Sequence, residues 1–72
     1  MSIADLLRSE GRQEGRQEGR QEAIIEALEL RFPCVPAGLV ERIRDVHDED
    51  RLRVLYRASL QTLTIEDFTD AL

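Results

Sequence analysis

The sequence predicts an all-α protein in which one long helix is followed by about three short ones. Residues 10–22 consist of the tetrapeptide Gly-Arg-Gln-Glu written three times after a first Glu, and this period of four is close to the 3.6 residues of an α-helical turn. Two prolines then separate the repeat from further amphipathic stretches. No segment shows the alternation of apolar and polar residues that is typical of a β-strand.

Small or apolar residues recur at every fourth position through the predicted long helix. Because these positions share one i, i+4 register, we expect a smooth stripe that lets a second helix backbone approach closely. A period of four turns the stripe by about 40° per step, which favours crossing helices over a long left-handed coiled coil. The stripe consists of Ile3, Leu7, Gly11, Gly15, Gly19, Ala23 and Ala27.

The charges of the repeat indicate pairing with a second helix. Each interior glycine weakens a helix by about 1 kcal/mol relative to alanine. The i, i+4 spacing also sets Arg12 beside Arg16 and Glu14 beside Glu18, which are pairs of like charge. We therefore expect these side chains to find opposite charges on a second copy; a solvated linker is the alternative. The predicted partner-binding residues are Leu7, Gly11, Gly15, Gly19, Ala23, Ala27, Arg12, Arg16, Glu14 and Glu18.

Capping signals and prolines predict where each helix begins and ends. The long helix should start at a capping box and a hydrophobic staple, formed by Ser2 with Asp5 and by Met1 with Leu6. It should end near Arg31 and Phe32, because Pro33 cannot continue it. The predicted organisation is a long helix over residues 1–32, a proline connector over 33–36 and a small helical bundle over 37–72.

The second and third helices carry the predicted core of the bundle. The second takes Pro36 into its first turn, stops around His47 and presents Leu39, Val40, Ile43 and Val46 on one face. Asp48 is the expected cap of the third helix, whose acidic first turn suits the helix dipole. The apolar stripe of the third helix is Leu52, Leu55, Tyr56, Ser59, Leu60 and Leu63, and we expect both Leu55 and Leu60 in the core.

A last short helix is predicted from Ile65 to about Ala71. Thr64 and Asp67 are placed for a capping box, and Leu63 and Phe68 for the accompanying staple.

Length and charge narrow the class of partner. A chain of 72 residues buries only a marginal core, so we expect a homo-oligomer, a dimer or larger. The net charge is −5, and each Arg of the repeat is matched by a Glu, which argues against nucleic acid as the main partner. No apolar run is long enough to span a membrane, and no signal peptide is visible, so we expect a cytoplasmic protein.

The sequence predicts neither an enzyme nor a cofactor or metal site. One cysteine, Cys34, and one histidine, His47, cannot complete a zinc site within one chain. The three consecutive carboxylates at 48–50 point in different directions on a helix, so a helix cap explains them better than a metal.

The repeat and the segments after it resemble a known family. Tandem Gly-Arg-Gln-Glu units followed by a short helical domain are similar to the C-terminal tail of the PD-(D/E)XK nuclease-family transposases, the recombination-promoting nuclease (Rpn) group. The segments that carry the resemblance are the repeat itself, residues 27–32 with the following proline loop, residues 40–43, residues 52–58 and residues 63–68. The nuclease centre of the family needs acidic residues and a lysine on a sheet, and this sequence has neither lysine nor a predicted strand.

The resemblance implies a non-catalytic tail. In the family such tails are also made as separate short proteins that restrain the full-length toxic nuclease. We therefore expect a self-associating interaction module, an antitoxin-like inhibitor that competes for the surface through which the longer nuclease dimerises. Two alternatives remain, a DNA-binding helix-turn-helix accessory protein built on residues 37–63 and a fragment without activity of its own.

Overall fold

The computed structural model of the chain confirms the all-α fold, with a long helix followed by three short ones. The structure describes residues 2–72, except for the side chains of residues 5–11 and 13 in the first helix. No strand occurs within the described residues. The helices are α1 (Ile3–Arg31), α2 (Ala37–Arg44), α3 (Glu49–Gln61) and α4 (Ile65–Ala71).

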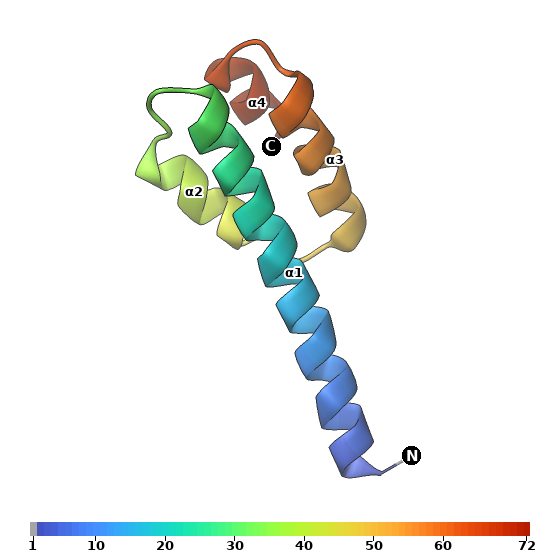
Figure 1. Cartoon of the computed structure of the whole chain (residues 1–72). Coiled ribbons are helices and arrows are strands. Elements are labelled where there is room, and N and C mark those ends of the chain that lie inside the picture. Colours follow the sequence, from blue (N-terminus) through green and yellow to red (C-terminus); the bar gives the residue numbers. More distant parts are fainter. Residues whose placement is uncertain (1) are drawn as a thin grey trace.

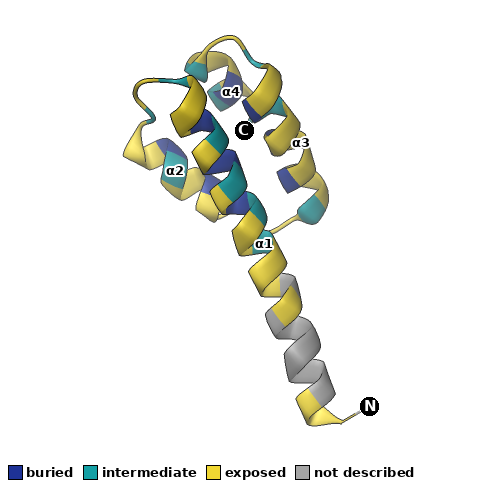
Figure 2. Cartoon of the chain, viewed as in Figure 1, coloured by how far each residue is buried: buried dark blue, intermediate teal, exposed yellow. Residues whose placement is uncertain are grey.

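Helix α1 is much longer than the bundle that it joins. Its C-terminal half lies between α2 and α3, whereas its N-terminal part projects away from the other three helices (Figure 1). The molecule is therefore elongated, with extents of 47 × 19 × 17 Å. Burial follows the same division, since the buried positions of α1 lie beside the bundle (Figure 2). The C-terminal half of α1 is thus a core helix.

One hydrophobic core joins all four helices. Its residues are at most 9% exposed, and α1 supplies three of them from a single face. Burying a side chain of this size contributes about 1.5–3 kcal/mol, so these few contacts dominate the stability of the bundle. The core consists of Ile24, Ile25, Leu28, Leu39, Ile43, Val46, Leu52, Leu55 and Phe68.

The C-terminal end of α1 falls at Arg31, as the proline connector predicts. The Arg31 guanidinium crosses to the end of α3, where Nη1 donates a hydrogen bond of 2.6 Å to the carbonyl of Ser59 and Nη2 one of 2.5 Å to that of Thr62. A cation at the end of a helix also interacts favourably with its dipole. The two helix ends are therefore joined by one side chain. The predicted staple and capping box at the start of α1 need Met1 and the side chains of Asp5 and Leu6, which lie outside the described part of the chain.

Helix α2 begins one residue later than a helix with Pro36 in its first turn would. Pro36 has an extended ψ of 139° and is the N-cap. Its carbonyl accepts hydrogen bonds from the amides of Leu39 and Val40, at 3.1 and 3.2 Å. Helical backbone therefore starts at Ala37.

Helix α2 also ends earlier than predicted. It stops at Arg44 instead of around His47, and Asp45 is its C-cap. Val46, which was expected on the helix face, lies in the connection to α3. It is nevertheless buried in the core, because the connection turns back across α1. The apolar character of Val46 predicted its burial but not the element to which it belongs.

The predicted cap of α3 is confirmed. The Asp48 side chain accepts hydrogen bonds from the amides of Asp50 and Arg51, at 2.9 and 3.3 Å. An N-cap of this kind is worth about 1 kcal/mol, and it accounts for one member of the acidic run at 48–50 without any metal.

Half of the apolar stripe predicted for α3 faces solvent. The row of Leu52, Leu55 and Ser59 is buried. Tyr56 and Leu60 each follow a buried residue by one position, so they are turned by about 100° and lie beyond the contact with α1. The exposed fractions are 42% for Tyr56, 52% for Leu60 and 86% for Leu63. The expectation that Leu60 is a core residue is wrong.

Helix α4 has the predicted cap without the predicted staple. The amide of Asp67 donates a hydrogen bond of 3.1 Å to the Thr64 hydroxyl. Leu63 is 86% exposed and cannot pack against the fully buried Phe68. Thr62 has extended backbone angles that end α3, so Leu63 lies in the linker and points away from the core.

Candidate functional site

The glycines, glutamines and charged residues of the repeat lie on different faces of α1. Each helical residue is turned by about 100°, so the glutamine of a unit lies nearly opposite the glycine two residues before it. Gly15 and Gly19 are exposed, whereas Gln17 is half-buried and Gln21 is buried. Each glycine is preceded by a Glu and followed by an Arg, and these two charges lie on opposite sides of the glycine. In the part of the repeat whose side chains the structure describes, the amides of Gln17 and Gln21 face the bundle and Gly15 and Gly19 face solvent.

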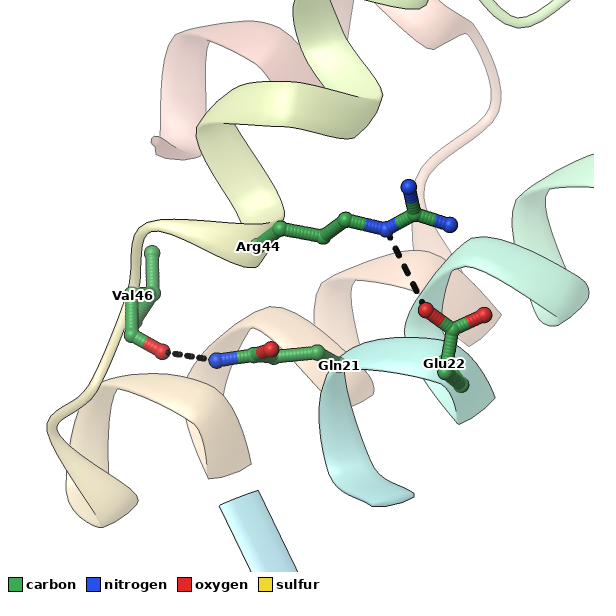
Figure 3. A network of polar contacts seen from close by, with 4 residues as sticks. All are labelled: Gln21, Glu22, Arg44 and Val46. Carbon is green, nitrogen blue, oxygen red and sulfur yellow. Dashed lines mark hydrogen bonds and ion pairs between the residues drawn. The ribbon is translucent and has the colours of Figure 1, made fainter. Parts of the chain in front are cut away.

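The glutamine side chains anchor the connection between α2 and α3. Gln21 Nε2 donates a hydrogen bond of 2.6 Å to the carbonyl of Val46 (Figure 3). Gln17 Nε2 donates one of 2.7 Å to the carbonyl of His47. Both carbonyls lie between the helices. Sequence reasoning missed this role, although the spacing of four residues already places the two amides on one face.

We expect Gln21→Ala to destabilise the protein by about 1–3 kcal/mol, because it leaves the buried carbonyl of Val46 without its donor. Urea unfolding followed by circular dichroism measures the loss. Gln17→Ala is the matched control, since its hydrogen bond is exposed and should contribute at most about 1 kcal/mol. Equal losses for the two variants would contradict the anchoring role of the buried amide.

A single ion pair joins α1 and α2 within the described part of the chain. Arg44 Nε lies 3.2 Å from Glu22 Oε1 (Figure 3). The two side chains are 56% and 60% exposed, and a pair that open to water contributes little to stability. This ion pair is relevant to partner binding because it engages the Glu22 carboxylate within its own chain.

The predicted small-residue stripe is open along the part that the structure describes. A Cβ atom built at Gly15 or Gly19 would meet no atom within 4 Å. Ala23 and Ala27 continue the stripe into the bundle, where they are half-buried. Leu7 and Gly11, the first predicted partner-binding residues, lie outside the described side chains.

The stripe runs into a groove between α1 and α3, which we call the α1–α3 groove. It consists of two shallow cavities of about 350 and 330 Å³ that share Ala23 and Tyr56. Helix α1 lines the groove with Arg16, Gly19, Arg20, Ala23, Glu26, Ala27, Leu30 and Arg31, of which Glu26 and Arg31 belong to the second cavity only. Helix α3 lines it with Leu52, Arg53, Tyr56 and Leu60. Tyr56 and Leu60, two exposed residues of the apolar stripe predicted for α3, are therefore part of this surface.

The charged residues predicted to bind a partner divide between two sides of α1. Arg16 lines the α1–α3 groove together with Arg20 and Arg53. Glu14 and Glu18 line a different cavity, formed with the two glutamines and His47. Arg12 is exposed on the projecting part. The predicted ion pairs to a second copy remain a prediction.

Other reactive residues are scattered. Cys34 is exposed in the connector, and His47 contributes its backbone carbonyl to the anchor of Gln17. Within the described residues, no three His, Cys, Asp or Glu side chains gather closely enough to hold a metal ion.

The fold and this surface define a small helical bundle with one projecting helix. Comparison of the chain with protein-family models, curated proteins and solved structures finds no match. In the part of the chain that the structure describes, none of the helices combines the length and the apolar character needed to cross a membrane.

Proposed function

We propose that this protein is a non-catalytic self-association module, whose repeat helix pairs with the same helix of a second polypeptide. The observation that carries the proposal is the open surface at Gly15 and Gly19 of α1. Within one chain a side chain at either position would meet no neighbour, and each glycine weakens the helix by about 1 kcal/mol. Their small size becomes useful when another backbone lies against them.

The α1–α3 groove supports the same proposal. Leu30, Tyr56 and Leu60 are 81%, 42% and 52% exposed, and all three line this groove. Large apolar residues gathered on one surface are typical of an interaction site. Since Ala23 and Ala27 line the groove as well, a helix that follows the stripe would also cover these apolar side chains.

The resemblance to nuclease tails suggests the second polypeptide. A longer nuclease with the same tail would present the same repeat helix. This chain would then occupy the surface through which the nuclease pairs with itself, and it would restrain the nuclease without supplying a catalytic residue. The restraint is thus competition between two copies of one surface.

The helix-turn-helix alternative would set the start of α3 in a DNA groove. The first residues of that end are Asp48, Glu49 and Asp50, and Asp48 already caps the helix. Carboxylates at this position would be repelled by phosphates. A gel-shift assay with random duplex at low salt separates the two functions, because the self-association module should leave the duplex unshifted.

We expect Gly15→Leu to weaken self-association while leaving the bundle folded. The added side chain projects from the stripe into the space that a partner backbone would need, although leucine favours the helix by under about 1 kcal/mol. Gly38→Leu is the matched control, because Gly38 also has open space around its Cβ position but lies in α2. Sedimentation at micromolar concentration should show a dimer or larger for the native chain and the control, and a lower mass for Gly15→Leu.

Co-expression with a longer relative tests the proposed restraint. The native chain and the Gly38→Leu control should relieve the toxicity of the nuclease, and Gly15→Leu should lose this relief. If the Gly15→Leu variant still relieves toxicity, the inhibitory surface lies on α2, α3 and α4 and not on the stripe of α1. If the native chain is a monomer in sedimentation and captures no nuclease at physiological salt, the proposed function is wrong.

A further inference from the structure

We infer that the partner in the α1–α3 groove is a second copy of α1 in parallel orientation, with its Glu14–Glu18 edge against Arg16, Arg20 and Arg53. This inference rests on the proposed self-association and adds its geometry. It starts from the two flanks of the glycine stripe. Glu14 and Arg16 enclose Gly15, and the same arrangement recurs around Gly19.

The stripe has one acidic edge and one basic edge. Because a helix turns by about 100° per residue, the residue before each glycine and the residue after it lie about 100° to either side. The acidic edge is therefore Glu14 with Glu18, and the basic edge is Arg16 with Arg20. All four are in helix α1.

The tertiary structure enlarges the basic edge. Arg53 of α3 lines the same cavity as Arg16 and Arg20, and no carboxylate lines that cavity. Neither edge is neutralised by an ion pair in the described residues, since the pair that is present joins Glu22 to Arg44. The apolar floor of the cavity includes Leu52 and Tyr56. The groove therefore suits a helix that carries carboxylates next to a row of small residues.

A second copy of α1 offers this combination. Its stripe supplies small residues, and its acidic edge supplies two carboxylates at a spacing of one helical turn, which matches the spacing of Arg16 and Arg20. In a two-fold pair each contact occurs twice, so the acidic edge of each copy meets the basic edge of the other. The match between charge and spacing identifies the occupant as this chain itself.

The direction of the second helix follows from symmetry. In a parallel pair the two-fold axis runs along the helices, and the acidic edge of each helix meets the basic edge of the other. In an antiparallel pair the two-fold axis lies across the helices, and acidic edge meets acidic edge while basic meets basic. Like charges at an interface are unfavourable. The two edges of the repeat therefore select the parallel pair.

Reversing one charge tests whether the acidic edge of one copy meets the basic edge of the other. In sedimentation at about 50 mM salt, where exposed charges are weakly screened, Glu18→Arg should raise the dissociation constant of the dimer about tenfold. Combining Glu18→Arg with Arg20→Glu exchanges the edges at Gly19 and should restore most of the affinity. Glu41→Arg makes the same charge change at an exposed position of α2 and should leave the affinity unchanged.

Cysteine cross-linking tests the direction. In a Cys34→Ser background, which removes the exposed native thiol, Gly15→Cys and Gly19→Cys are made in separate chains. A parallel pair predicts that each chain forms a disulfide with its own copy. An antiparallel pair allows at most one of the two to do so. It cross-links the two different chains, when they are mixed, if its two-fold axis passes beside Gln17.

The outcomes separate this inference from the proposed function. A native chain that stays monomeric would overturn both. A dimer in which Glu18→Arg behaves like Glu41→Arg, or in which cross-links form chiefly between the two different cysteine chains, would overturn the parallel pair and leave self-association standing. The parallel pair would be established by three results together. Glu18→Arg weakens the dimer, adding Arg20→Glu restores its affinity, and each of the two cysteine chains forms a disulfide with its own copy.

Discussion

Replacing Leu55 with alanine is expected to remove a large part of the free energy of unfolding of this protein. Leu55 is fully buried in the core that joins the four helices. Truncating such a leucine costs about 2–5 kcal/mol, because it removes apolar contacts and leaves a cavity. A domain of 72 residues has a total stability of roughly 4–11 kcal/mol, so the loss consumes a large part of it. Thermal and urea unfolding by circular dichroism measure the change.

Leu60→Ala provides the matched control for this experiment. It makes the same change five positions further along α3, at a side chain that is 52% exposed. The expected loss is below about 1 kcal/mol, as for other surface substitutions. A large loss at Leu60 together with a small loss at Leu55 would mean that α3 packs through the side that carries Tyr56 and Leu60, and not through the row that contains Leu55.

The second large effect is expected at Phe68, the fully buried residue of α4. Phe68→Ala should cost about 3–5 kcal/mol. A helix of seven residues is not stable by itself, so α4 depends on its contacts with the core, to which Phe68 contributes the buried side chain and Ile65 a partly buried one. We expect the amides of Ile65–Ala71 to lose their protection from hydrogen exchange.

Phe68→Leu is the control, because it keeps most of the apolar volume. It should retain measurable protection in α4 and a melting temperature between those of the native chain and Phe68→Ala. Protection of α4 that is unchanged in Phe68→Ala would show that the helix is held by other contacts, such as the hydrogen bond from Arg51 to the carbonyl of Leu72.

Local signals predicted the elements of this protein well. The prolines after Arg31, the Asp48 cap and the Thr64 cap act on residues only a few positions away, so the sequence shows both partners of each interaction. The i, i+4 register of the repeat likewise predicted a continuous helix. The exposure of Gly15 and Gly19, and the division of the repeat charges between two sides, follow from the same period.

What depends on a distant neighbour could not be predicted in this way. The stripe of α3 was wide enough to be buried from either side, and only its contact with α1 decided that Ser59 is inside and Leu60 outside. Val46 is buried although it lies outside the helices, because Gln21 of α1 donates a hydrogen bond to its carbonyl and so keeps the connection between α2 and α3 against α1.

The sequence by itself determined an all-helical chain with a long repeat helix, the caps of α3 and α4, and a row of small residues in which Gly15 and Gly19 are exposed. These features need only the period of a helix and interactions within one turn. The tertiary structure decided that the glutamines of the repeat hold a loop and that Arg53 joins the basic edge. It also placed Tyr56 and Leu60 on the groove, since side chains far apart in the chain become neighbours only when the helices pack.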